Sequence, residues 1–201
     1  MGHSGLPARR IRYKKPSLCC RNESKKETHY YRRWLAIRVY GRKAVETIKH
    51  KLIAFDQSTT ATGFCLMEVG SLDIIKSGVL KPTGTTNERI RKTIKACIRL
   101  CSEHQPTFVF IEGIQVQKNP KIYEILAKLQ GTLEISLEEK GYIVNVVKAT
   151  EWRKRVGIKS RKRADVKKEA IELVKELYDL EVSEDESEAV LFARAFAIEQ
   201  E

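Results

Sequence analysis

Two short apolar runs that each end in an acidic residue constrain the fold of this chain more than any other feature. The first run is residues 52–55, followed by Asp56, and the second is residues 108–111, followed by Glu112. Such unbroken apolar runs are typical of strands that are buried on both faces of a sheet. Ligand sites in open α/β sheets lie beyond the carboxyl ends of the strands. If the two strands are neighbours, Asp56 and Glu112 converge at such an edge.

The segments around these runs predict an α/β fold. Residues 64–67 and 74–80 are expected to form two strands of an antiparallel meander with the first run, and residues 142–147 a fifth strand. Apolar residues at helical spacing predict helices over residues 88–103, from residue 120, over residues 164–178 and from residue 183. A basic loop is expected after the fifth strand. This order indicates a five-stranded mixed sheet flanked by helices.

The basic charge of the chain is concentrated at its N-terminus. Residues 1–50 hold 14 of the 38 lysines and arginines but only three of the 26 acids, which leaves residues 51–201 close to neutral. We therefore divide the chain into a basic, flexible extension over residues 1–50 and one folded domain over residues 51–201. Aromatic residues beside arginines at positions 30–34 are compatible with nucleic-acid binding, but we favour a disordered tail, a transit-like leader or an upstream extension.

A third group of acids opens the last predicted helix. Ser183 and Glu186 match a capping box, which accounts for one acid structurally. Asp185 and Glu188 lie three residues apart and therefore on one face of the helix. Together with Asp56 and Glu112 they give four acids from three elements. Such an all-oxygen set suits Mg²⁺, with Mn²⁺ as a substitute, and two ions held in this way can activate water in phosphodiester hydrolysis.

Several other classes of protein are excluded by the sequence. The five cysteines lack the partners of a zinc site, and their odd number argues against a disulfide framework. No phosphate-binding loop or dinucleotide fingerprint is present, so no nucleotide cofactor is expected. No apolar run is long enough to span a bilayer, and we expect a cytoplasmic protein of a bacterial or phage-infected cell.

The ordered set of motifs resembles the RuvC family of Holliday junction resolvases, within the RNase H-like superfamily. The resemblance runs from about Leu52 to Ala197 and rests on four segments, which are Asp56-Gln57-Ser58, Ile111-Glu112, Val156-Gly157-Ile158 and Asp185-Glu186-Ser187-Glu188-Ala189. It implies an RNase H-like fold, a homodimer, and paired symmetric nicks in four-way DNA junctions with Mg²⁺ or Mn²⁺. The sequence departs from the family pattern at Glu188, where relatives carry Asp, and at Gln115, where they carry an aromatic residue.

A run of cations is predicted to bind the phosphates of DNA. Seven of the eleven positions 153–163, after the fifth strand, are basic, and they are expected to lie near the edge of the sheet that holds the acids. The resemblance singles out Arg163 as matching a basic position near the active centre. Trp152 is expected to pack beneath this loop. The candidate DNA contacts are Lys118, Arg153, Lys154, Arg155, Lys159, Arg161, Lys162 and Arg163.

The sequence therefore predicts a crossover junction endodeoxyribonuclease in which Asp56, Glu112, Asp185 and Glu188 are the catalytic metal ligands. One alternative is an RNase H-like nuclease that acts on forks, flaps or RNA–DNA hybrids. Another is a DNA-binding protein that has kept the fold without catalysis. Cleavage of branched DNA in Mg²⁺ separates these interpretations.

Overall fold

The computed structural model describes residues 49–116 and 119–198. Its strands are β1 (Lys51–Asp56), β2 (Thr62–Glu68), β3 (Ile74–Leu80), β4 (Phe108–Gly113) and β5 (Ile143–Lys148). Its helices are α2 (Thr86–His104), α3 (Pro120–Glu138), α4 (Ala149–Arg155), α5 (Arg163–Tyr178) and α6 (Glu184–Ala197). Lys118 and the basic extension up to residue 48 lie outside the described residues, so the expectations for them stay predictions.

The five strands form one mixed sheet in the order β3-β2-β1-β4-β5. Strands β1, β2 and β3 pair antiparallel as a meander, whereas β4 is parallel to both β1 and β5. Phe55 on β1 is opposite Ile111 on β4, so these two strands end side by side. The predicted adjacency of the two apolar runs is confirmed, and with it the α/β fold.

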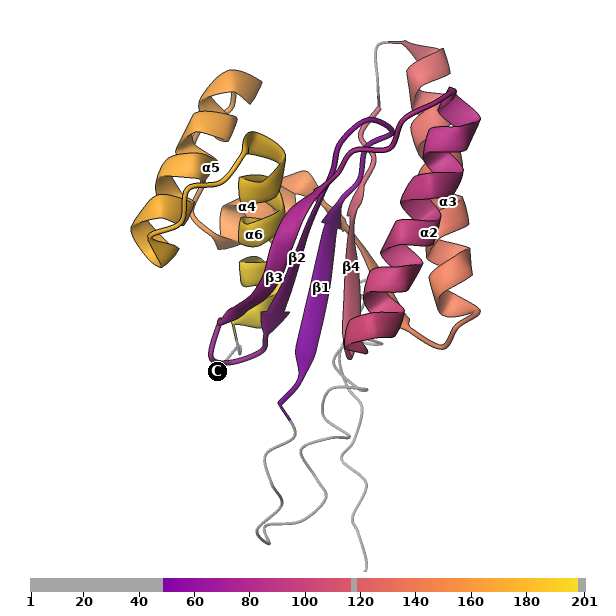
Figure 1. The fold of residues 1–201 in the computed structure, drawn as a ribbon. Helices are drawn as coiled ribbons and strands as arrows, with labels where there is room; N and C mark the ends of the chain where they lie inside the picture. Colours follow the sequence, from indigo (N-terminus) through magenta and orange to yellow (C-terminus); the bar gives the residue numbers. More distant parts are fainter. Residues whose placement is uncertain (1–48, 117–118, 199–201) are drawn as a thin grey trace, which may run out of the picture. The chain divides into compact units, whose positions relative to one another are not determined.

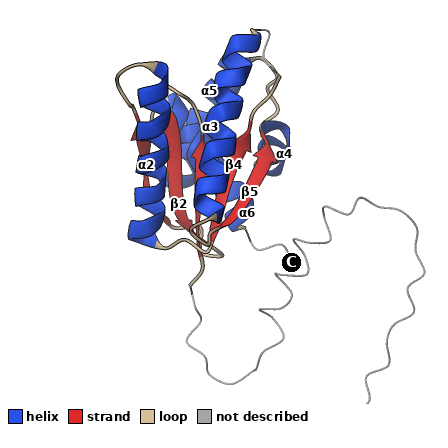
Figure 2. Cartoon of the chain, turned by 90° about the vertical axis from the view of Figure 1, so that its right-hand side faces the viewer, coloured by secondary structure: helices blue, strands red, loops and turns tan. Residues whose placement is uncertain are grey.

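The helices cover the sheet on both faces. Alternate β1 residues point to opposite sides, as the two-residue period of a strand requires. Leu52 and Ala54 belong to a core with α4, α5 and α6, whereas Ile53 and Phe55 belong to a core with α2 and α3. Figure 1 shows α2 and α3 on one side of the sheet and the other three helices opposite, and Figure 2 looks onto the α2–α3 face.

Helix α6 is the most deeply buried helix of the described residues. Seven consecutive residues, from Ser187 to Ala193, are buried, because the helix packs on β1 and β2 with α4 and α5 at its sides. Phe192 contacts the rings of Phe110 and Trp152 at centroid distances of 6.3 and 5.8 Å. Beyond its acidic first turn, the helix has apolar residues on most of its sides, which accounts for this burial. Its first turn consequently has a fixed position over the strand ends.

Two local expectations were wrong. Residues 149–155 form helix α4 rather than a loop; the segment is only seven residues long, and no side chain caps its start. Ser183 is the N-cap of α6 but makes no capping hydrogen bond. The Glu186 carboxylate instead accepts a 2.6 Å hydrogen bond from Ser77 Oγ on β3. A tertiary partner has therefore replaced the local one, and Glu186 ties α6 to the sheet.

Among the helices within residues 49–116 and 119–198, none combines the length and the apolar character needed to cross a bilayer.

Candidate active site

The four predicted acids meet at one end of the sheet. Asp56 ends β1, and Glu112 precedes the last residue of β4. By strand alternation, Asp56 faces the same side as Ala54, and Glu112 the same side as Phe110. Both of these apolar residues pack in the core that includes α6. Asp185 and Glu188, in the first two turns of α6, cover that end of the sheet. We call these four residues the acid cluster.

The charges of the acid cluster repel one another strongly. Burial raises the pKa of Asp56 well above its usual value, and the charges of Glu112, Glu188 and Asp185 raise it further. Burial also raises the pKa of Glu112, and the negative charge of Glu188 raises it further. The positive charge of Arg153 opposes the increase at both residues. The fold therefore concentrates negative charge at a place where a bound cation would be stabilising.

Two neighbouring residues of α4 hold two of the acids. The Trp152 indole N–H donates a 2.7 Å hydrogen bond to Glu112 Oε2. Arg153 Nη2 donates to Glu188 Oε1 at 2.9 Å, and its guanidinium lies 5.1 Å from the centroid of the Trp152 ring. Trp152 is fully buried, so the expectation that it packs beneath the following segment is confirmed. It also restrains Glu112, which packing alone did not predict.

A pair of glutamines fixes the backbone beside Asp56 and Glu112. Gln57 Nε2 donates to the Glu112 carbonyl at 3.0 Å and to Gln130 Oε1 at 3.1 Å. Gln130 Oε1 also accepts from the Ile114 backbone N–H at 2.8 Å. The network joins the ends of β1 and β4 to helix α3. Side-chain hydrogen bonds of this kind restrict the directions in which both carboxylates can point.

Gly63 allows α6 to approach the sheet. It pairs with Asp56 across β1 and β2. A Cβ at this position would lie 2.0 Å from the Asp185 carbonyl oxygen and 3.1 Å from Ala189 Cβ. The contact is between backbones, which is why only glycine fits there. The position of Asp185 relative to Asp56 therefore depends on the absence of a side chain at residue 63.

Helix α5 supplies a further contact to the start of α6. Lys167 Nζ lies 2.6 Å from Glu184 Oε2 and 3.9 Å from Asp185 Oδ1. The Lys167 side chain is 19% exposed and that of Glu184 is 58% exposed, so water still screens part of this ion pair. Lys167 thus restrains the exposed edge of the acid cluster.

The donor set fits a hard divalent cation, because all four side chains offer carboxylate oxygens. Among the described residues, however, no three side chains of His, Cys, Asp or Glu converge closely enough to coordinate one ion. Two of the acids are hydrogen-bonded to α4 instead. These bonds use Glu112 Oε2 and Glu188 Oε1, and the acid side chains must draw closer together before three of them can hold one ion.

A hollow of about 680 Å³ lies beside the acid cluster. We call it the basic hollow because four predicted DNA contacts line it, and the full lining is Thr150, Arg153, Lys154, Gly157, Ile158, Lys159, Ser160, Arg161 and Val166. The Glu169 carboxylate accepts hydrogen bonds of 2.9 Å from the backbone N–H groups of Lys159 and Ser160. These bonds hold the segment in place while its cationic side chains stay accessible.

The other predicted DNA contacts have different surroundings. Arg155 pairs with Glu151 at 3.1 Å and lies 4.5 Å from the centroid of the Phe196 ring, so its charge is already engaged within the domain. Lys162 and Arg163 are exposed at the start of α5. The charge of Arg163 lowers the pKa of Glu112, which places it within electrostatic range of the acid cluster.

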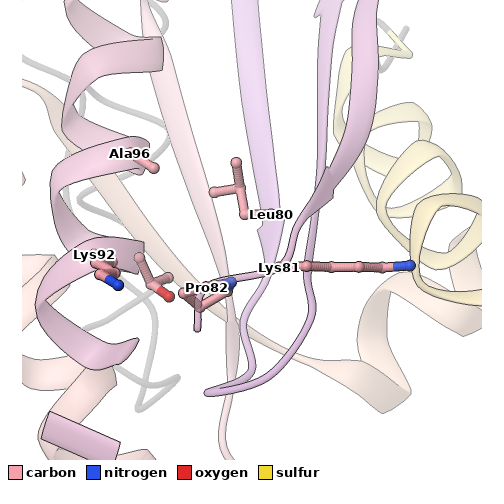
Figure 3. Close-up of a pocket in the computed structure, with 6 residues that line it drawn as sticks. Leu80, Lys81, Pro82, Lys92 and Ala96 are labelled. Carbon is pink, nitrogen blue, oxygen red and sulfur yellow. The ribbon is translucent and has the colours of Figure 1, made fainter. Parts of the chain in front are cut away.

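A second pocket lies on the other face of the sheet, the face that α2 and α3 cover. It has a volume of about 180 Å³ and lies between the end of β3 and helix α2, lined by Leu80, Lys81, Pro82, Lys92, Thr93 and Ala96. Figure 3 shows Lys81 extending away from the other labelled residues of this pocket. No acid or nucleophilic group other than the Thr93 hydroxyl faces it, so it adds nothing to the acid cluster.

Sequence reasoning missed the residues that position the acids. The second strand was expected from residue 64, which left out Gly63 although it lies in β2, and Gln57 entered only as part of the Asp56-Gln57-Ser58 motif. A buried tryptophan needs a partner for its N–H group, and this rule is the one signal that could have indicated a polar partner for Trp152. No local signal identifies Gly63, because its role depends on the approach of a helix more than a hundred residues later.

The family model for "Crossover junction endodeoxyribonuclease RuvC" matches residues 52–198. The chain belongs to the RuvC family. The match spans all five strands of the sheet and all four members of the acid cluster, which confirms the family expected from the motifs. A search of curated protein sequences found no match.

Solved structures of Holliday junction resolvases share the fold. Thermus thermophilus RuvC in complex with a Holliday junction substrate is 14% identical, with a TM-score of 0.60 over 74% of this chain and 92% of that chain. Fowlpox virus resolvase, solved with Holliday junction DNA, is 13% identical, with a TM-score of 0.50 over 73% and 96%. The yeast mitochondrial Holliday junction resolvase is 12% identical, with a TM-score of 0.51 over 74% and 78%. At these identities the likeness establishes the RNase H-like fold.

Proposed function

We propose that this chain is a metal-dependent endonuclease that resolves four-way DNA junctions by paired symmetric nicks. The observation that carries the proposal is the convergence of Asp56, Glu112, Asp185 and Glu188 at one end of the sheet, beside the basic hollow. Family membership supports the class of reaction. The geometry supports the division of the site into a part that cuts and a part that holds the strand.

Asp56, Glu112, Asp185 and Glu188 are the residues that would hold Mg²⁺, or Mn²⁺ in its place, with two ions per site in our proposal. The ions would supply an activated water and charge stabilisation for the leaving oxygen. The protein supplies the orientation. Helix α4 and the glutamine pair restrain Glu112, and the close packing on Gly63 places the first turn of α6 against the end of β1.

The basic hollow would bind the backbone of the strand that is cut. Lys154, Lys159 and Arg161 line it, and Arg163 lies within electrostatic range of Glu112. Contacts of this kind hold phosphates and set the register of the DNA without reading its sequence. Placing them beside the acids brings a phosphodiester to the metal ligands.

Two sites are needed for paired nicks, and we propose a homodimer. A two-fold symmetric dimer would present two acid clusters to a junction of matching symmetry. The runner-up function is an RNase H-like nuclease that acts on forks, flaps or RNA–DNA hybrids. It has the same chemistry but a different arrangement of the two sites.

The deciding experiment compares a synthetic four-way junction with duplex, fork and RNA–DNA hybrid in about 10 mM Mg²⁺ or Mn²⁺, an excess over weak Mg²⁺ sites. We expect symmetric nicks in the junction alone, and none with Asp56→Asn. Cutting of fork or hybrid in preference would favour the runner-up. If the wild-type protein binds junctions but does not cut them, the endonuclease proposal is rejected and a non-catalytic DNA-binding protein is favoured.

Removal of the charge of Lys159 or Arg161 is expected to weaken DNA binding equally for all sequences. Each substitution to Gln should reduce the slope of log K against log salt by about 1, because one fewer counterion is released. Junction binding of the Asp56→Asn protein across a salt series measures this slope. Lys168→Gln is the matched control, since Lys168 is an exposed α5 lysine outside the hollow. An unchanged slope for both hollow variants would contradict the assignment.

A further inference from the structure

Arg153 contacts the acid cluster, although the sequence suggested only a DNA contact. Its Nη2 atom lies 2.9 Å from Glu188 Oε1, and the Glu188 side chain is only 8% exposed. Few water molecules can therefore replace this partner. The charge of Arg153 also lowers the pKa values of Asp56 and Glu112 against the effect of burial. One guanidinium thus acts on three of the four acids.

The contact leaves the Arg153 side chain incompletely satisfied. Its Nε atom is buried without a hydrogen-bond partner among the described residues. An arginine offers five donors, and a buried donor without a partner destabilises the arrangement that contains it. Arg153 also lines the basic hollow, together with Lys154, Lys159 and Arg161. The basic hollow therefore offers the Arg153 guanidinium a second position, next to its present one at Glu188, with open space and access to phosphates.

We propose, building on the metal-dependent function above, that Arg153 is the internal counterion of the acid cluster. It holds Glu188 while no metal ion is bound, and it leaves Glu188 when a divalent cation takes over the neutralisation. The released guanidinium turns into the basic hollow and joins the cations that bind phosphate. Arg153 is a positioning residue in this scheme, and it couples metal binding to completion of the DNA surface.

The proposal and two simpler roles for Arg153 predict different changes in metal affinity when Arg153 is removed. As an internal counterion, Arg153 competes with the metal ion for Glu188, so its removal tightens metal binding. As a purely structural ion pair, it would hold Glu188 in place for the metal ion, so its removal would weaken metal binding. As a DNA contact alone, it would not affect metal affinity in the absence of DNA.

Calorimetric titration of the full chain with Mn²⁺, without DNA, tests the sign. We expect Arg153→Gln to bind Mn²⁺ about tenfold more tightly than the wild-type protein. This is the ratio expected if Arg153 leaves Glu188 free to bind the ion in only about 10% of the wild-type molecules. Arg153→Lys keeps a charge but loses the planar guanidinium, and should fall between the two. Lys154→Gln is the matched control, because Lys154 lies on the same helix and lines the same hollow. Its Mn²⁺ affinity should equal that of the wild-type protein.

Thermal unfolding gives an independent measurement. In EDTA, Arg153→Gln should unfold at a lower temperature than the wild-type protein, because buried Glu188 loses its partner. Saturating Mn²⁺ should remove this difference. If the wild-type protein binds no Mn²⁺, both the proposed metal site and the counterion role of Arg153 are contradicted. If it binds Mn²⁺ and Arg153→Gln binds equally or more weakly, only the counterion role is overturned and the nuclease proposal stands.

Discussion

Asp56→Asn should abolish cleavage and, at the same time, make the metal-free protein more stable. The loss of rate is expected to be on the order of a thousandfold or more, because a metal ligand contributes several kcal/mol of charge stabilisation in the transition state. The gain in stability follows from the burial, and then the repulsion, that raise the pKa of Asp56, since an amide of the same shape carries no charge. For a chain of this size, each kcal/mol of relieved repulsion raises Tm by about 2–4 °C.

The effect on stability has a defined pH dependence. An aspartate in the unfolded chain ionises near pH 4. Because the folded-state pKa is raised, the folded protein binds more protons than the unfolded chain above that pH. The stability of the wild-type protein therefore falls as pH rises from about 4 through the folded-state pKa, and it stays reduced above it. Asp56→Asn removes the contribution of this residue, so the two proteins should differ most at neutral pH.

Thermal unfolding in EDTA at pH 4 and pH 7.5, paired with the junction-cleavage assay, measures both effects. Saturating Mg²⁺ should narrow the difference at pH 7.5, because the ion neutralises the repulsion in the wild-type protein. Equal Tm values for the two proteins at pH 7.5 in EDTA would contradict the electrostatic argument. Retained cleavage would contradict the catalytic role.

Gly63→Ala is the second substitution with a large expected effect. The new methyl group would lie 2.0 Å from the Asp185 carbonyl oxygen and 2.9 Å from the Asp185 carbonyl carbon. Both atoms belong to the backbone, so no change of rotamer relieves the overlap, and α6 must move away from the sheet. A displacement of about 1 Å at a catalytic site lowers activity by about a hundredfold. Overpacking of this kind also destabilises a protein by about 1–3 kcal/mol.

Gly131→Ala is a matched control for this substitution. Gly131 lies on α3, and a Cβ there would have no atom within 4 Å. Alanine is favoured over glycine within helices by up to about 1 kcal/mol, so this variant should be as active as the wild-type protein and slightly more stable. Denaturant unfolding and junction cleavage of both variants provide the comparison. Full activity in Gly63→Ala would show that the site does not depend on the close approach of α6.

The sequence predicted the convergence of the four acids because each follows a strong pattern. Asp56 and Glu112 terminate unbroken apolar runs, and Asp185 and Glu188 open a helix with an apolar face. These patterns reflect the buried sheet itself, which local sequence encodes through hydrophobicity. The parallel pairing of β1 and β4 then brings the first two acids together.

The contacts that restrain the acids were not predictable in the same way. Arg153 and Glu188 are 35 residues apart, and their pairing depends on the packing of α4 beside α6. Helix α4 is too short and too charged to show an amphipathic period. Glu186 matched a local capping pattern, but Ser77 on β3 offers it a stronger partner in the folded state. Tertiary structure decided each of these contacts.

The late position of α6 along the chain has a consequence for synthesis in the cell. Strands β1 and β4, with Asp56 and Glu112, leave the ribosome well before residues 184–197 are made. Until α6 packs, the sheet lacks both the apolar cover of that face and half of its acids. The proposed nuclease site is therefore incomplete in the nascent chain until α6 has been made and has packed on the sheet.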